Sequence, residues 1–191
     1  MTDPALACIE VSSIARGVML LDVIVKRAPV RLVHHGRHSN GKYIIVLSGG
    51  VAEVEEAHRA ALDSAGPALV GHVLLSAAHA GVVKALNGKL ATSGDDALYL
   101  VEMTAVWSAI EALDVALKYV DCAVVDLHLA SGIGGKGYFA IQGDQADLEA
   151  VQDLLLGRFN DQIVDQHVIA RPHHDMLAAV GHAGPFQVDQ G

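Results

Sequence analysis

Histidine is the residue whose number and spacing in this chain most invite a chemical interpretation. Eleven histidines occur among 191 residues, and they cluster at His34-His35, at His38 and at His173-His174. Neutral imidazole is a common metal ligand, but adjacent residues of a strand point to opposite faces, so such a pair does not hold one ion. We find no cysteine or carboxylate at ligand spacing beside these clusters, and no HExxH motif. The sequence therefore predicts no metal site.

The segment SGIGGKG, residues 131–137, suggests phosphate binding at first sight. A P-loop needs a glycine at its first position and a serine or threonine directly after its lysine, because that hydroxyl binds magnesium. Ala130 and Gly137 occupy these two positions, so the sequence argues against a nucleotide hydrolase. From the residues alone, a plain glycine-rich hairpin and a loop that presents main-chain N–H groups to a ligand are equally supported.

No set of residues forms a recognisable catalytic arrangement. A nucleophile elbow, a Cys–His pair at interpretable spacing and a dinucleotide fingerprint after a strand are all missing from the sequence. Acidic residues gather instead in the N-terminal halves of predicted helices, where they complement the helix dipole: Glu53, Glu55, Glu56, Asp147 and Glu149. We therefore expect a protein that is not an enzyme and that carries no cofactor.

Composition argues against two classes of partner. The formal charge of −9 leaves no basic face to replace the counterions of a nucleic acid. No apolar run reaches the roughly 18 residues that span a bilayer, and no basic-then-apolar signal pattern opens the chain. Cys8 and Cys122 fall in predicted strands at unrelated positions, so we expect two buried, reduced thiols in a reducing cytosol rather than a disulfide.

The chain contains an internal repeat. Residues 10–33 match residues 102–125 at an offset of 92, with Glu10 matching Glu102 and Lys26 matching Lys118. Downstream, Gly49 matches Gly143 at an offset of 94, and residues 72–74 match residues 167–169 at an offset of 95. Such drift is typical of two homologous modules whose loops differ in length. Since each module supplies only half of the functional unit, we expect function to depend on how the modules assemble.

Each module predicts the same elements, a small antiparallel sheet with helices packed on it, so the expected class is α/β in the form of two α+β two-layer sandwiches. Ser13 as N-cap and Pro29 as stop bound the first helix, whose apolar residues share one face: Ile14, Val18, Leu21 and Val25. The expected strands are 5–11, 30–35, 43–47, 72–75, 98–103, 122–129, 137–142 and 163–169. The expected helices are 14–27, 51–65, 78–86, 105–119, 144–157 and 173–180. The expected domains are 4–87 and 96–181, and residues 181–191 are expected to be disordered.

These elements and motifs together resemble the bacterial microcompartment shell domain. The second module carries the fuller motif set: Asp114–Lys118 on its first helix, Gly132–Lys136 in a loop, Gln142-Gly143-Asp144 in a turn, and residues 167–173 with the sequence HVIARPH. The resemblance covers residues 5–180 and implies two tandem ferredoxin-like domains in the cytoplasmic shell of a bacterial microcompartment. It further implies a homotrimeric, pseudohexameric tile of the single-disc type, in lateral contact with hexameric and pentameric shell proteins.

The resemblance also implies that the loop before the third strand of each module lines a central pore. The expected pore-lining residues are His38, Ser39, Asn40, Gly41, Ile133, Gly134 and Gly135. Glycine permits a constriction of main-chain amides, and Arg37, Lys42 and Lys136 are expected to add positive potential for small polar or anionic metabolites. His38 is expected to titrate near neutral pH at the channel mouth. Some tandem shell proteins hold an iron–sulfur cluster on a pore-loop cysteine, but neither loop here contains cysteine.

The outer edge of the tile is implied in the same way. In the resembled family, a lysine at the place of Lys26 and Lys118 packs against its counterpart on the next tile, and an arginine at the place of Arg171 inserts across that edge. Residues 76–79 of the first module contain no arginine, so three of the six edges are expected to lack that contact and to favour mixed tiling. The alternative hypothesis is a trimeric ferredoxin-like sensor or carrier that binds a small ligand in its loops.

Overall fold

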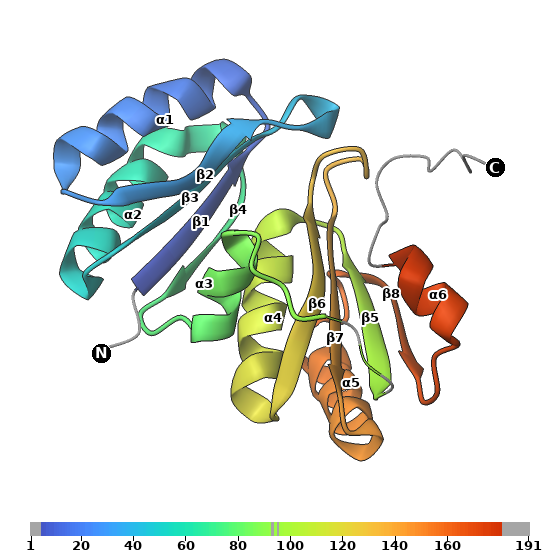
Figure 1. Cartoon of the computed structure of the whole chain (residues 1–191). Helices are drawn as coiled ribbons and strands as arrows, with labels where there is room; N and C mark the ends of the chain where they lie inside the picture. Colours follow the sequence, from blue (N-terminus) through green and yellow to red (C-terminus); the bar gives the residue numbers. More distant parts are fainter. Residues whose placement is uncertain (1–4, 93, 95, 181–191) are drawn as a thin grey trace.

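Two copies of one structural unit follow each other along the chain (Figure 1), and the computed structural model describes residues 5–92, 94 and 96–180. Domain 1 contains β1 (Ala5–Val11), α1 (Ile14–Arg27), β2 (Arg31–Arg37), β3 (Tyr43–Gly49), α2 (Val51–Ala65), β4 (Leu69–Leu75) and α3 (Ala80–Leu86). Domain 2 contains β5 (Ala97–Met103), α4 (Val106–Tyr119), β6 (Cys122–Leu129), β7 (Gly137–Gly143), α5 (Gln145–Phe159), β8 (Ile163–Ile169) and α6 (His174–Val180).

Each domain forms one antiparallel sheet of four strands, in the order β2-β3-β1-β4 and β6-β7-β5-β8. The expected class and the duplicated four-stranded sheet are thereby confirmed. In both sheets the first strand of the domain, β1 or β5, is central and pairs with two strands that come later in the chain, so the two sheets share one topology as well as one sequence pattern.

The strand registers correct the last offset that the sequence suggests. Ile9 pairs with His72 in domain 1, and the equivalent Val101 pairs with Gln166 in domain 2. The true offset is therefore 92 up to the loop before β3 and 94 for every element after it, from Tyr43 and Gly137 onward. The apparent match of residues 72–74 with residues 167–169 is wrong by one residue, which on a strand moves each side chain to the other face.

Helix α1 begins and ends where the sequence predicts, but a different face of it is buried. The Ser13 hydroxyl accepts a hydrogen bond from Arg16 N at 3.2 Å, and Ala28 ends the helix before proline. The residues that pack on the sheet are Gly17, Leu20 and Ile24. The apolar stripe of Ile14, Val18 and Val25 instead lies largely in solvent within this chain.

Helix α4 of domain 2 lies between the two sheets (Figure 1) and joins the domains through a shared core. Its residues Val106, Ile110 and Leu113 are buried in one cluster with Leu6 and Cys8 of β1. Helices α1 and α2 cover the other face of domain 1's sheet, so every residue of β1 is buried. The side chain of Trp107 lies against Gly71 of β4 and leaves no room for a Cβ there. We call this contact of α4 with β1, β4 and the neighbouring α3 the domain seam.

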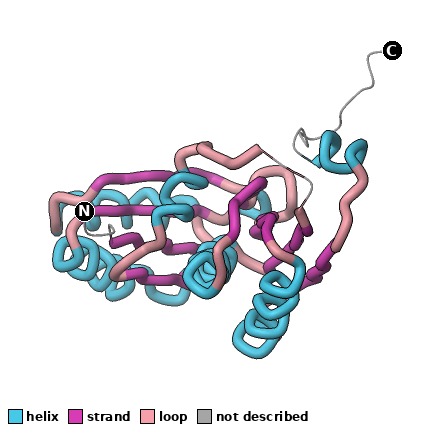
Figure 2. The backbone as a smooth tube through the Cα atoms, turned by 60° about the horizontal axis from the view of Figure 1, so that its bottom comes forward, coloured by secondary structure: helices cyan, strands magenta, loops and turns pink. Residues whose placement is uncertain are grey.

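Within the described part of the chain, the matching face of domain 2's sheet is covered by the short helix α6 and by no long helix. This face carries Leu98 and Leu100, and Leu98 is buried with Leu177 of α6; we call it the open sheet face. Figures 1 and 2 both place α6 at the side of the molecule remote from domain 1. Helix α1 lies on the opposite, outer side of domain 1 (Figure 1). Among the described residues no helix is long and apolar enough to span a membrane. The expected tail 181–191 lies outside the described residues.

A histidine pair joins α2 to β4 in domain 1. His58 Nε2 lies 3.2 Å from His72 Nδ1, and the His58 side chain is buried. Burial, and secondarily the neighbouring His72, lowers the pKa of His58 to about 4. The positions equivalent to His58 and His72 in domain 2 are Gln152 and Gln166, so only domain 1 contains titratable groups at this contact.

Domain 1 is therefore expected to lose stability as the pH falls from about 6.5 to about 4. The pKa of His58 in the folded chain lies below its unfolded value of about 6.5, so in this window the unfolded chain binds more protons than the folded one. The free energy of unfolding therefore falls by up to about 1.4 kcal/mol for each unit by which the pH is lowered. His58→Gln should flatten the dependence of the urea midpoint on pH, and exposed His35→Gln should not. Equal slopes for the native chain and His58→Gln would contradict this assignment.

Candidate functional site: the paired loops and the domain seam

The two loops expected to line a pore meet within one chain. The first contains the 3-10 turn Ser39–Gly41 between β2 and β3, and the second is the turn between β6 and β7. The Asn40 side-chain amide donates a hydrogen bond to the carbonyl oxygen of Gly134 at 3.0 Å. Both loops contain residues in the left-handed region, with φ of 66° at Asn40, 70° at Gly41 and 82° at Gly135. These backbone conformations explain the glycines and the asparagine, because other residues are strained there.

His38 stands at the base of the first loop and is less accessible than expected. Its Nδ1 lies 3.3 Å from the Ser131 hydroxyl of the second loop, and its ring stacks on that of His34 with 5.9 Å between centroids. Its Nε2 is buried and has no hydrogen-bond partner among the described residues. Burial, reinforced by His34 and opposed by Glu10, lowers the pKa of His38 below the usual value for histidine.

The lysines beside the two loops are neutralised by buried or half-buried glutamates. Lys42 Nζ lies 2.7 Å from Glu10 Oε1, and Lys136 Nζ lies 2.6 Å from Glu102 Oε1. Contrary to expectation, these two lysines add little net positive potential to the loops, because each ammonium faces a carboxylate. Of the three expected cations, only Arg37 takes part in no ion pair within the described part of the chain.

Glu10 also connects the two domains across the seam. Its second oxygen, Oε2, accepts a hydrogen bond from Val106 N, the first amide of α4, at 3.1 Å. The first amides of a helix have no acceptor inside the helix, and a carboxylate there also faces the positive end of the helix dipole. The sequence repeat marks Glu10 and Glu102 as equivalent, but a matched glutamate in a strand gives no sign of the partner it will contact.

Asp114 makes the second polar contact of the seam and holds one of the expected edge lysines. Its Oδ1 accepts a hydrogen bond from His79 N at the start of α3, at 2.7 Å, and its Oδ2 lies 2.6 Å from Lys118 Nζ. In domain 1 the equivalent pair, Asp22 and Lys26, lies 2.7 Å apart but is largely exposed to solvent. Both expected lysines thus bend back onto their own helix.

Arg171, the third expected edge residue, lies exposed in the connection between β8 and α6. Its structural equivalent at the offset of 94 is Ala77, so the absence of an arginine from this position of domain 1 stands. A single chain does not bring Arg171 into an ion pair with any described residue. If it acts at an edge, its partner belongs to another chain.

The two equivalent helices α1 and α4 differ sharply in exposure. Val106, Ile110 and Leu117 of α4 are 0%, 0% and 6% exposed because the seam covers them. Their counterparts in α1, which are Ile14, Val18 and Val25, are 39%, 54% and 50% exposed. Side chains of this kind are normally buried in groups, and a contiguous exposed group marks a contact surface. We call Ile14, Val18 and Val25 the α1 face.

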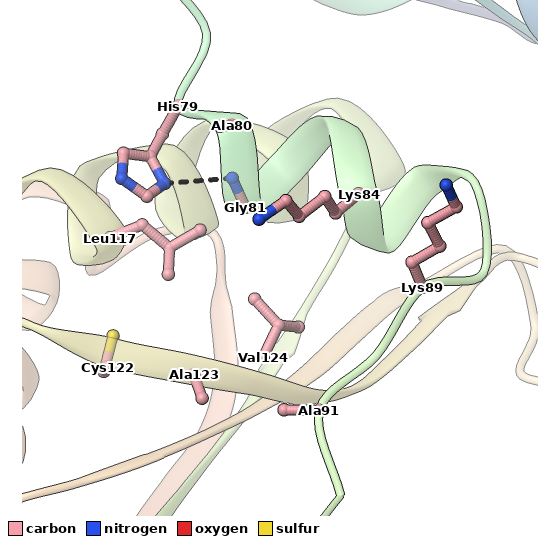
Figure 3. Close-up of a pocket in the computed structure, with 10 residues that line it drawn as sticks. All are labelled: His79, Ala80, Gly81, Lys84, Lys89, Ala91, Leu117, Cys122, Ala123 and Val124. Carbon is pink, nitrogen blue, oxygen red and sulfur yellow. Dashed lines mark hydrogen bonds between the residues drawn. The ribbon is translucent and has the colours of Figure 1, made fainter.

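A cavity of about 250 Å³ lies beside the seam, between α3 and β6 (Figure 3). Lys84 and Lys89 reach its rim, while Leu117, Cys122 and Val124 form its floor. Burial first, then the charges of Asp121 and Asp147, raises the pKa of Cys122 to about 11, so the thiol is protonated at neutral pH. Cys8 is fully buried in β1 as expected, whereas Cys122 is only partly buried.

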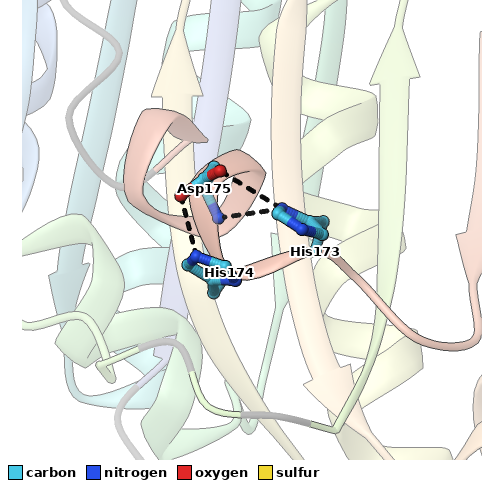
Figure 4. A group of neighbouring side chains, drawn as sticks. All are labelled: His173, His174 and Asp175. Carbon is cyan, nitrogen blue, oxygen red and sulfur yellow. Dashed lines mark hydrogen bonds and ion pairs between the residues drawn. The ribbon is translucent and has the colours of Figure 1, made fainter.

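One group of potential metal ligands was missed by the sequence reasoning. His173, His174 and Asp175 each offer a ligand atom, and these atoms all lie within 4.8 Å of one another (Figure 4). The conclusion that no carboxylate stands at ligand spacing is therefore wrong. Asp175 directly follows the histidine pair, and a tight turn into α6, rather than a strand, brings the three side chains to one side.

Known proteins share this architecture. The family model named BMC domain matches the chain twice, over residues 5–78 and 97–172. The bacterial microcompartment shell protein PduT of Citrobacter freundii is 32% identical over 174 residues, which are 90% of this chain and 95% of that protein. A microcompartment protein from Desulfitobacterium hafniense has a similar structure with a TM-score of 0.81 and 30% identity, covering 91% of this chain and 98% of that one.

A fused permuted hexameric shell protein from the RMM microcompartment is a more distant structural neighbour, with a TM-score of 0.57 and 26% identity over 81% of this chain and 84% of that one. The chain therefore belongs to the BMC-domain family. It is a shell protein of a bacterial microcompartment with two BMC domains in tandem, which confirms the family and the shell role that the sequence motifs suggested.

Proposed function

We propose that this chain is a structural component and not an enzyme, and that three copies form a flat, pseudohexameric shell tile around a central pore. The observation that carries the proposal is the pair of unequal faces described above. The α1 face exposes the positions that α4 buries, and the β5–β8 sheet carries only the short helix α6, among the described residues, on the face that β1 and β4 use to hold α4. Seating α1 of one copy on the open sheet face of the next repeats the seam that already exists within the chain.

Ring closure follows from the geometry of these faces. Helix α1 and the part of domain 2 formed by β8 and α6 lie at opposite ends of the molecule (Figure 1), so a contact between α1 and the β5–β8 sheet of the next copy is head to tail. Head-to-tail contacts close into a ring when each step applies the right rotation, and otherwise form open filaments. Here each contact copies the internal one, so six similar domains from three chains complete the ring.

A specific polar contact supports this arrangement. Glu102 is the counterpart of Glu10, and Ile14 is the counterpart of Val106, at the common offset of 92. In the tile, Glu102 of one chain should accept a hydrogen bond from Ile14 N of the next, while Lys136 keeps its present bond to Glu102. The half-exposed Glu102 carboxylate would then be buried as Glu10 is now.

The pore is proposed at the meeting point of the paired loops. Three copies place six loops around the axis, alternating between residues 38–41 and residues 133–135, with main-chain groups at the constriction. Since Lys42 and Lys136 are paired with glutamates, selection for small polar metabolites rests on these main-chain dipoles, and any preference for anions rests on Arg37.

Lateral contacts are proposed at Lys26, Lys118 and Arg171, towards hexameric and pentameric shell proteins or other copies of this tile. Only domain 2 supplies the arginine, so the six edges of the tile alternate between two kinds. Such alternation favours neighbours of more than one type, because an edge without Arg171 and an edge with it do not present the same surface.

The test compares the native chain with the double variant Lys26→Ala, Lys118→Ala. The native chain should have a solution mass of about 60 kDa, three times its 20.0 kDa, by light scattering, and should form flat discs in electron micrographs. The variant should keep this mass and lose extended sheets, because each lysine is substantially exposed and, within the part of the chain that the structure describes, pairs only with an aspartate of its own helix.

A charge-matched control is Lys84→Ala, Lys89→Ala, which removes two lysines from the rim of the cavity and should leave both the mass and the sheets unchanged. A native mass of 20 kDa would overturn the tile. Loss of the trimer in the Lys26→Ala, Lys118→Ala variant would overturn the edge assignment while leaving the tile in place.

A further inference from the structure

The turn that leads into α6 collects two imidazoles and a carboxylate on its solvent side. His174 Nε2 lies 2.9 Å from Asp175 Oδ1, and His173 Nδ1 lies 3.5 Å from Asp175 Oδ2 (Figure 4). We propose that His173, His174 and Asp175 bind a divalent transition-metal ion of the zinc type, with water completing the coordination. The pore loops and the tile geometry make no use of these three side chains.

The spacing of the ligand atoms suits a single ion. Nitrogen and oxygen ligands lie about 2.0–2.2 Å from zinc, so two ligands of a tetrahedral site are roughly 3.3–3.5 Å apart. The two histidines lie 2.9 Å and 3.5 Å from different oxygens of the Asp175 carboxylate, close to that spacing, and one ligand atom from each residue lies within 4.8 Å of the other two. Small rotations of three exposed side chains are enough to bring them onto one ion.

The hydrogen bonding of the turn shows which nitrogen of His173 is available as a ligand. Asp175 N–H donates to His173 Nδ1 at 3.3 Å, so this nitrogen is unprotonated and carries a lone pair. The same nitrogen lies 3.5 Å from a carboxylate oxygen of Asp175. A metal ion bound to Nδ1 would take the place of the hydrogen bond from Asp175 N, because Nδ1 has a single lone pair.

The equivalent turn of domain 1 keeps the cap but lacks the other ligands. His79 precedes α3 as His173 precedes α6, and its Nδ1 accepts a hydrogen bond from Gly81 N at 3.1 Å. Ala80 and Gly81 occupy the positions of His174 and Asp175. The same backbone turn therefore forms without a second histidine and an aspartate, and the set of three potential ligands occurs in domain 2 alone.

The position of His79 at the seam indicates where the metal would lie in the tile, and this step rests on the proposed function. His79 N donates to Asp114 in the seam, so His173 N should donate to Asp22, the counterpart of Asp114, on the neighbouring chain. A second carboxylate then stands next to the ligand turn and holds it in place. The ion would lie at each of the three contacts between chains and at none of the contacts within a chain.

The test is isothermal titration of the whole purified chain with Zn²⁺, using variants that keep the fold. The native chain should bind one ion per chain at this turn, and His174→Ala should weaken that binding at least tenfold. The matched control is His167→Ala, since His167 pairs with Asp165 at 3.2 Å as an exposed histidine with a single carboxylate. Equal binding by all three proteins, or equal losses in both variants, overturns the proposal.

Two further variants separate the metal site from the tile. All three ligands come from one chain, so a monomeric variant should still bind zinc, and loss of His174 should still abolish that binding. In the trimer, Asp22→Asn should weaken zinc binding about tenfold, as for other groups that orient metal ligands, and should not do so in the monomer. An Asp22→Asn trimer with native affinity would overturn the position at the chain contact.

Discussion

Val18→Asp is expected to convert the trimer of about 60 kDa into a folded monomer of 20.0 kDa. Val18 is 54% exposed in the chain, whereas its counterpart Ile110 is fully buried by domain 1. In the tile, Val18 takes the place of Ile110 and meets the open sheet face of the next copy. A carboxylate buried there without a partner costs on the order of 3 kcal/mol per contact, and the ring contains three such contacts. Light scattering after size exclusion measures the mass directly.

The matched control is Val51→Asp. Val51, at the start of α2, is 44% exposed, and its counterpart Gln145 is also exposed, so neither domain buries this position in a seam. Both variants add one negative charge to an exposed helical valine, and only the first should change the mass. Urea unfolding should show that the Val18→Asp monomer is still folded. A trimer that tolerates Val18→Asp would contradict the proposed contact.

Local structure was accessible to sequence reasoning because its causes are local. Helix α1 runs over Ile14–Arg27 as predicted, since a serine cap and a proline two residues after the helix determine its ends. The strand before α2 and the strand after it were predicted too short, ending at residue 47 and starting at residue 72. The outer residues of these two strands do not follow the alternating apolar pattern from which strands are predicted. β4 begins already at Leu69, directly after a 3-10 turn.

The partners of the apolar residues were not accessible in the same way. The stripe of Ile14, Val18 and Val25 was correctly assigned to a helix, but a helical period does not say whether the stripe meets its own sheet or another surface. In α1 the sheet receives the small, narrow face of Gly17 and Leu20, so the wide apolar stripe remains outside. The repeat supplies the missing information, because α4 shows the same stripe already covered.

The candidate site shows the same division between local and distant causes. The glycines of the paired loops were expected from the motif, and their left-handed conformations agree with that expectation. The neutralisation of Lys42 by Glu10 was not expected, because 32 residues separate two side chains that become neighbours only when β1 and β3 pair. The ligand turn was missed because the rule for adjacent residues of a strand was applied to His173-His174, although a helix was expected to begin at residue 173.

Glu10→Gln is expected to destabilise the single chain by about 3 kcal/mol, the loss typical of a buried ion pair deprived of one partner. The carboxylate of Glu10 is fully buried, holds Lys42 at 2.7 Å and accepts the first amide of α4 at 3.1 Å. Glutamine keeps the size and one acceptor oxygen, but it leaves a mostly buried ammonium without a counter-charge. The urea midpoint of the monomeric Val18→Asp background measures the loss without interference from assembly.

Glu102→Gln in the same background is the internal control, because it repeats the substitution at the equivalent position. Glu102 and Lys136 are both about two-fifths exposed, so their pair contributes at most about 1 kcal/mol to the single chain. In the native, trimeric background Glu102→Gln should instead affect assembly. Glu102→Gln should raise the concentration at which the trimer dissociates, because its carboxylate is proposed to receive Ile14 N of the next chain. Equal destabilisation of the monomer by both substitutions would contradict the proposal that the contact between chains repeats the domain seam.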